Sequence, residues 1–118
     1  METIFQAETR KGSRWTALLV PFRWIFALGL ESSAHRMVEA HEWRGASEAY
    51  RRLIEGSPRQ ASFHTEAGLA YLMMNQWEPA EDRLREALRL APTELRAYDF
   101  LGMLLANQGR IEEAERTF

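Results

Sequence analysis

The chain of 118 residues contains no cysteine and few other features that point to a chemical site. Without thiols it has no disulfides, no thiolate metal ligands and no cysteine nucleophiles. It also lacks strand patterns, a glycine-rich phosphate loop and a serine nucleophile elbow. Its three histidines, His35, His41 and His64, are not spaced to share a zinc ion. The sequence therefore predicts no catalytic residues, no metal site and no cofactor.

Positive charge is too sparse for a nucleic-acid binder. The formal net charge is −2, and of the fifteen basic residues only Lys11 is a lysine. Proteins that bind nucleic acid concentrate positive charge on one face or along one helix. We therefore expect no nucleic-acid partner.

A hydrophobic run long enough to span a membrane is also missing. The most apolar stretch, Trp15–Leu30, follows a basic head at residues 1–14 and is interrupted by Pro21 and Arg23. A spanning helix needs roughly 20 apolar residues, and no small-residue cleavage site follows to suggest a secretory signal. We favour a helix that begins near Pro21 and caps the following domain, so that residues 15–26 form a capping segment. Peripheral contact of residues 15–26 with a membrane is the alternative, and the expected location is cytoplasmic or, on that alternative, at a membrane.

What the chain does contain is a period of thirty-four residues. Small residues recur at Ala46, Ala80 and Ala114, and larger ones at Tyr50, Leu84 and Phe118. Prolines recur at the same offset, at residues 58 and 92. A period of this length is typical of a helix pair that stacks on its neighbours to build a solenoid.

The unit at residues 61–94 shows the two helices most clearly. His64, Ala67, Gly68 and Tyr71 lie at helical spacing, and Asn75 favours the left-handed turn that ends a helix. A second helix then has Pro79 in its first turn, directs Ala80, Leu84 and Ala87 inward, and pairs Glu81 with Arg85 and Glu86 with Arg89 outside. Pro92 forces Ala91 into extended geometry and ends the unit.

These residues resemble the tetratricopeptide-repeat family. The matching positions are Gly68, Tyr71, Ala80, Leu84, Ala87 and Pro92 in the second unit, Ala46, Tyr50 and Pro58 in the first, and Gly102 and Ala114 in the third; His64 stands where the family has tryptophan. The resemblance implies an all-α fold, a right-handed α-α superhelix (solenoid) of antiparallel helix pairs. About two and a half tetratricopeptide-like repeats are expected after the N-terminal apolar helix.

The repeat count predicts a domain at residues 27–118, with repeats at 27–60 and 61–94 and a truncated one at 95–118. Phe118 is the twenty-fourth position of its repeat, so the helix that should cover the third repeat is cut short. Repeat arrays normally end in a helix with a polar outer face. We therefore expect a fragment of a longer protein, or an open end covered by another molecule, which includes self-association through this uncapped repeat.

The resemblance implies a concave groove lined by the first helix of each repeat. The groove positions of the family correspond to Glu31, His35, Val38, Thr65, Leu69, Leu72, Met73, Arg96, Asp99 and Met103. The apolar ones, Leu69, Leu72, Met73 and Met103, suit an amphipathic helix or an extended peptide with apolar anchors. The same spacing is also typical of a core, so both interpretations stay open for these four.

Two classes of function follow. The first is a non-catalytic scaffold or adaptor that binds a peptide or partner protein in the groove. The second is a substrate-recruiting arm of a larger enzyme, a transferase, whose catalytic domain lies beyond residue 118. Family members that bind the acidic tails of heat-shock chaperones have lysine and asparagine where this chain has Glu31 and His35, so that partner is not expected.

Overall fold

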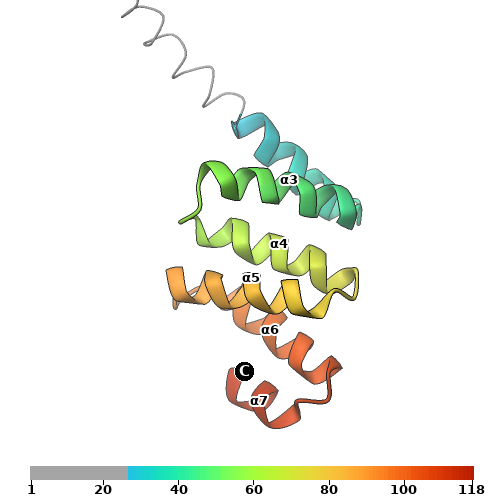
Figure 1. Cartoon of the computed structure of the whole chain (residues 1–118), viewed down its shortest axis with the longest axis vertical. Coiled ribbons are helices and arrows are strands. Elements are labelled where there is room, and N and C mark those ends of the chain that lie inside the picture. Colours follow the sequence, from blue (N-terminus) through green and yellow to red (C-terminus); the bar gives the residue numbers. More distant parts are fainter. Residues whose placement is uncertain (1–26) are drawn as a thin grey trace, which may run out of the picture. The chain divides into compact units, whose positions relative to one another are not determined.

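The structure, a computed structural model, describes residues 27–118, and these are helical with no strand among them. Residues 27–39 form a helix, followed by five more (Figure 1): α3 (Trp43–Gly56), α4 (Ala61–Met73), α5 (Trp77–Leu90), α6 (Leu95–Asn107) and α7 (Ile111–Thr117). Glu31–Phe118 form one compact unit. The expected basic head (1–14) and apolar segment (15–26) lie outside the described residues.

Consecutive helices of this unit run in opposite directions and pack as pairs. α3 packs on α4, α4 on α5, α5 on α6 and α6 on α7, and α4 also contacts α6 directly (Figure 1). The helical residues 31–39, α4 and α6 therefore run the same way, and α3, α5 and α7 run back. The all-α solenoid of helix pairs expected from the period is confirmed.

The turns inside the three helix pairs repeat with the sequence period. His41, Asn75 and Gly109 have positive φ values of 60°, 59° and 76°. In each turn the next amide donates a hydrogen bond five residues back, as from Gln76 N to Tyr71 O at 2.9 Å and from Arg110 N to Leu105 O at 2.9 Å. This is the Schellman arrangement, in which one left-handed residue satisfies the last carbonyls of a helix. The predicted helix end near Asn75 is confirmed.

Proline ends the second helix of each complete pair. α3 ends two residues before Pro58 and α5 ends two residues before Pro92. Ala91 is extended, with φ −142° and ψ 93°, because the proline ring excludes helical geometry at the preceding residue. Its amide still donates to Ala87 O at 2.8 Å, so the helix end keeps a hydrogen bond.

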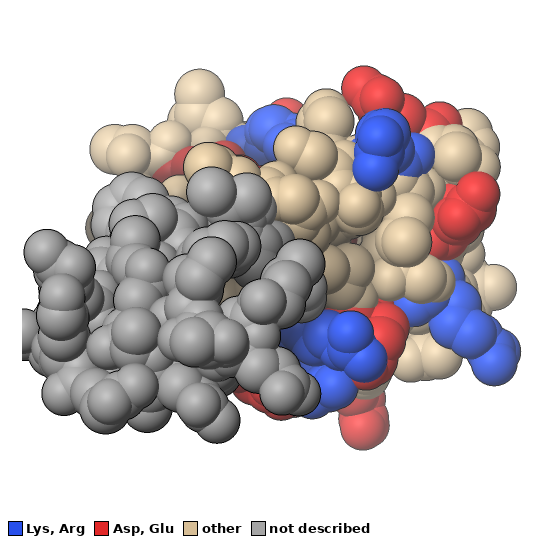
Figure 2. Space-filling view, turned by 90° about the horizontal axis from the view of Figure 1, so that it is seen from above, with Lys and Arg blue, Asp and Glu red and all other residues tan. Residues whose placement is uncertain are grey.

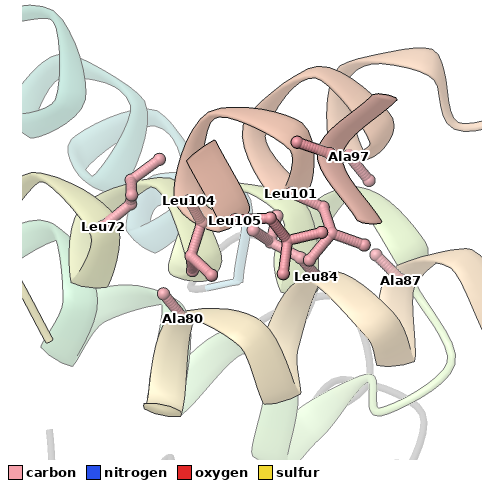
Figure 3. Packing of buried hydrophobic residues seen from close by; sticks show 9 residues of the cluster. Leu72, Ala80, Leu84, Ala87, Ala97, Leu101, Leu104 and Leu105 are labelled. Carbon is pink, nitrogen blue, oxygen red and sulfur yellow. The ribbon is translucent and has the colours of Figure 1, made fainter. Parts of the chain in front are cut away.

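The core alternates large and small side chains from α4, α5, α6 and α7. Leu84, Leu104 and Leu105 are fully buried and fill the space between helices (Figure 3). Alanines at the closest approaches, among them Ala80 and Ala97, are also fully buried. Small residues at these points let the helices approach, and the leucines interdigitate between them.

Gly68 marks the closest approach within the second pair. A Cβ atom placed there would lie 2.7 Å from both Cγ and Cδ2 of Leu84, which is closer than real Cβ contacts. The third pair repeats the arrangement, since the ring of Phe118 lies against Gly102. Leu84 is fully buried, whereas Phe118 is 69% exposed. The contact between the glycine and the large side chain is therefore buried in the second repeat and exposed to solvent in the third.

Candidate functional site

The helix α4 is buried on almost every side, and Met73 is the only one of its residues that is exposed rather than half-buried or buried. Ser62 and Leu69 are half-buried, Glu66 is buried and Met73 is exposed. These four residues follow one another at intervals of four, three and four, so they lie along one side of the helix. On α6 the corresponding stripe is exposed at Arg96, Asp99, Met103 and Ala106. We call these two stripes together the α4–α6 face.

An ion pair joins the two stripes. The Arg96 guanidinium donates to Oε1 of Glu66, although the two residues are thirty positions apart. The Glu66 side chain is 8% exposed, while that of Arg96 is 56% exposed and lies over the Phe100 ring, 5.3 Å from its centroid. Arg96 therefore covers a buried carboxylate from the solvent side of the face.

Negative charge gathers around this ion pair. Burial raises the pKa of Tyr50 to about 12, and the charges of Glu66 and Glu31 add to the rise while Arg96 opposes it. Glu31, Tyr50, Glu66 and Arg96 come from four different helices, so their charges meet at one end of the α4–α6 face. Glu66 is bonded to Arg96, and Glu31 adds a second negative charge that acts on Tyr50.

Two methionines lie at the other end of the face. Met73 follows Glu66 by seven residues and Met103 follows Arg96 by seven, and each is 46% exposed. Seven residues advance a helix by about 10 Å, so Met73 lies that far along α4 from Glu66 and Met103 that far along α6 from Arg96. Leu69, half-buried, lies between the two ends on α4. The face thus joins an acidic end to a flexible apolar end.

Comparison with known proteins identifies the fold. No model of a known protein family matches the chain. The small glutamine-rich tetratricopeptide repeat-containing protein 2 of Mycosarcoma maydis is 27% identical over 89 residues, which are 75% of this chain and 25% of that protein. The second tetratricopeptide-repeat domain of Spaghetti (RPAP3), solved bound to the HSP90 peptide SRMEEVD, superposes with a TM-score of 0.73 at 23% identity over 78% of this chain and 85% of its own. The chain has a tetratricopeptide-repeat fold.

The resemblance drawn from the sequence is thereby confirmed for the fold. A second tetratricopeptide-repeat structure, the yeast Sti1 domain TPR2B in complex with an Hsp70 peptide, gives a TM-score of 0.74 at 19% identity over 77% of this chain and 73% of its own. The Yersinia enterocolitica translocator chaperone SycD gives 0.74 at 20% identity over 77% and 69%. The chain spans only about a quarter of the length of the fungal relative.

The expected groove residues separate into exposed and buried sets. Glu31, His35, Met73, Arg96, Asp99 and Met103 are exposed, and Val38 and Leu69 are half-buried. Their role in binding stays a prediction. Thr65 and Leu72 are only 1% and 3% exposed, so the structure contradicts their placement as open ligand contacts.

Both corrections have a physical reason. Leu72 packs in the core cluster with Leu84, Leu104 and Leu105, so the core interpretation of its helical spacing holds. The Thr65 hydroxyl donates to Ala61 O at 3.2 Å, one helical turn back, and needs no other partner.

Histidines of the tetratricopeptide-repeat unit serve packing and surface contacts. His64, which replaces the family's tryptophan, is buried, and its Nε2 donates to Pro58 O at 2.8 Å. His35 Nε2 lies 3.3 Å from Glu39 Oε1, both side chains being about two-thirds exposed. Among residues 27–118 no three histidine or acidic side chains are grouped to hold a metal ion.

Sequence reasoning misses Glu66, because helical spacing puts it off the inward stripe of its helix. Its importance depends on Arg96, whose contact with it crosses from one repeat to the next. A signal is available in the sequence: an acidic and a basic residue thirty positions apart in a thirty-four-residue repeat lie about one helical turn apart on adjacent parallel helices, within reach of a long arginine side chain. The outer side has a matching bond, from Arg110 Nη1 to Glu81 Oε1 at 2.8 Å.

Charge on the rest of the unit is mixed. The expected pairs of Glu81 with Arg85, at 2.8 Å, and of Glu86 with Arg89 are both present. In the described part of the view in Figure 2, acidic and basic side chains lie beside one another rather than gathering by sign. Within residues 27–118, no helix has the length and apolar character needed to cross a membrane.

Proposed function

We propose that this chain is a protein-interaction module, an adaptor that binds a peptide segment of a partner protein on the α4–α6 face. The observation that carries the proposal is the pair of half-exposed methionines, Met73 and Met103, on two helices that contact each other, α4 and α6. Methionine side chains are flexible and polarisable, which suits a surface that accepts varied apolar side chains.

The fold gives this proposal independent support. Solved neighbours with the same fold hold HSP90 and Hsp70 peptides, as the Spaghetti and Sti1 domains do. A peptide laid across α4 and α6 would bury the methionine side chains against its own apolar anchors. Burial of apolar surface on binding stabilises a complex by about 25 cal/mol for each Å².

The face differs from what those acidic peptides require. The peptide SRMEEVD carries three carboxylate side chains and one arginine. The α4–α6 face presents Glu66 and Asp99 against Arg96 alone, with Glu31 nearby on the preceding helix. We therefore propose a partner other than an acidic chaperone tail.

Selection from a random peptide library displayed on phage, with the purified chain as bait, tests the proposal. The selected peptides are then measured by fluorescence anisotropy against Met73→Asp and Met103→Asp. We expect each substitution to weaken binding about tenfold, because a charge replaces an apolar contact. Circular dichroism should stay helical, since both side chains are about half exposed.

Ile111→Asp is the matched control, because Ile111 is 52% exposed on α7, away from the face. The proposal predicts unchanged binding for this variant. If Ile111→Asp weakens binding while Met73→Asp and Met103→Asp do not, the binding surface lies at the C-terminal helix and the proposal is wrong.

Self-association through that end stays a separate prediction. Ile111 and Phe118 are 52% and 69% exposed, so apolar surface is present on α7 and at the last residue. Sedimentation of the purified chain over a range of concentrations would show a dimer if this surface pairs, and Ile111→Asp should then shift the equilibrium to monomer.

A further inference from the structure

The carboxylate of Glu66 has an unmet acceptor inside the α4–α6 face. Its Oε1 accepts from Arg96, but Oε2 accepts no hydrogen bond from any described residue, and less than 1 Å² of that atom is accessible. A buried charged oxygen without a donor is costly, because desolvation is not repaid. Such an atom is satisfied when a further donor reaches it.

Arg96 is the only described cation bonded to Glu66, and the surrounding residues cover it only in part. Its side chain is 56% exposed, and besides Glu66 it contacts the ring of Phe100 on its own helix. Moving Arg96 away would leave a buried carboxylate without its donor, which is costly, so Arg96 moves aside only where a cation of the ligand takes its place. Arg96 thus covers the Glu66 carboxylate until a cation of a ligand replaces it.

The surroundings of that carboxylate favour a cation and oppose an anion. The charges of Glu66 and Glu31 both act on Tyr50, and Asp99 follows Arg96 by one helical turn. A lysine or arginine side chain from a ligand would donate to Oε2 and offset the excess negative charge. A glutamate in the same place would meet like charges in a partly desolvated setting.

We propose that the α4–α6 face selects a peptide that places a basic side chain at Glu66 and apolar side chains on Met103 and on Met73, which lies about 10 Å along α4 from Glu66. This proposal rests on the proposed function, because it names the ligand chemistry of the same face. In a polyproline-type segment, about 3.1 Å per residue, the basic and apolar side chains are three positions apart. In a helical segment they are seven positions apart.

The experiment compares peptide libraries selected on the unmodified chain with those selected on Glu66→Gln. The substitution removes the charge and keeps the shape of the side chain. We expect basic residues to outnumber acidic ones about fivefold among peptides selected on the unmodified chain, and Glu66→Gln to bring the two near parity. Glu86→Gln is the control, because Glu86 pairs with Arg89 on α5 and its loss changes the net charge equally.

A second variant tests the cover. Arg96→Met keeps an apolar side chain over Phe100 and removes the cation that is bonded to Glu66. A synthetic lysine-containing peptide from the selection should therefore bind this variant about fivefold more tightly than it binds the unmodified chain. The same peptide with glutamate in place of lysine should gain nothing. Equal affinity of the two peptides for Arg96→Met would overturn the proposal, as would basic enrichment that survives Glu66→Gln.

Failure of the function and failure of this inference give different results. If no peptide is enriched, or the enriched peptides bind independently of Met73 and Met103, the peptide-binding function is wrong. If peptides bind through the methionines but show no preference for basic residues, or prefer acidic ones, the face binds peptides and only the assignment of Glu66 is wrong.

Discussion

Replacement of Gly68 by alanine is the sharpest test of the packing between α4 and α5. An alanine Cβ would lie 2.7 Å from both Cγ and Cδ2 of Leu84 and 3.4 Å from Ala80 O. Leu84 is fully buried among core residues and cannot retreat without moving them. The new methyl group therefore forces the two helices apart or drives Leu84 from its rotamer.

The magnitude follows from two opposing contributions. Overpacking a dense core costs roughly 1 to 3 kcal/mol. Alanine in a helix interior is more favourable than glycine by about 0.5 to 1 kcal/mol, which offsets part of that cost. We expect Gly68→Ala to lower the free energy of unfolding by about 1 kcal/mol, and Gly68→Leu to prevent folding.

Chemical denaturation followed by circular dichroism measures the effect, and the chain supplies its own controls. Gly56 ends α3, and a methyl group placed on it would have no atom within 4 Å, so Gly56→Ala should be neutral or stabilising. In Gly102→Ala the atoms nearest the new methyl group belong to the ring of Phe118, which is 69% exposed and can rotate away, so the cost should be small. Equal stability of Gly68→Ala and Gly56→Ala would refute the assigned helix packing.

Three further predictions concern the turns, the core and the ion pairs. Asn75→Ala should lower the free energy of unfolding by about 1 kcal/mol relative to Asn75→Gly, because the φ of 59° suits glycine; equal denaturation midpoints would contradict this. Leu72→Ala should cost about 2 to 5 kcal/mol in the same assay, as for other core leucines, whereas Met73→Ala should change stability little. Burial alone would raise the pKa of Glu81, but hydrogen bonds from Arg110 and Arg85 outweigh it and hold the pKa below the ordinary value of a glutamate. A lowered folded pKa gives stability that is present above the unfolded pKa and lost as pH falls through the folded one. Arg110→Ala should therefore destabilise the chain at neutral pH, and the difference from the unmodified chain should shrink as the pH falls through the folded pKa of Glu81; a constant difference would count against the bond.

Much of the fold could be predicted from the sequence because each repeat carries strong local signals. Asn75 and Gly109 tolerate positive φ and end their helices, and Pro92 stops the next one. The spacing of Ala80, Leu84 and Ala87 on one side of α5 indicates the buried face, and all three are fully buried. These signals act within a few residues, so the sequence records them directly.

The candidate site could be predicted less well, because helical spacing shows which residues share one side of a helix but not whether that side faces solvent or another helix. Leu72 and Met73 are neighbours at the end of α4, yet one is core and the other is exposed. Glu66 escapes a reading of its own repeat because its partner, Arg96, belongs to the next one. A contact between repeats depends on the angle at which two helix pairs stack, and the pattern within a single repeat does not specify that angle.

The most direct test of the binding face uses the methionines themselves as reporters. In a chain labelled at methionine methyl groups, a peptide from the library selection is titrated while the NMR signals are followed. Met73 and Met103 are 46% exposed on the face, whereas Met74 is half-buried at the end of α4 and Met37 lies against Gly45. Our account predicts that the signals of Met73 and Met103 shift together on binding while those of Met37 and Met74 stay in place. Saturating binding that moves Met37 and leaves Met73 and Met103 unchanged would contradict it.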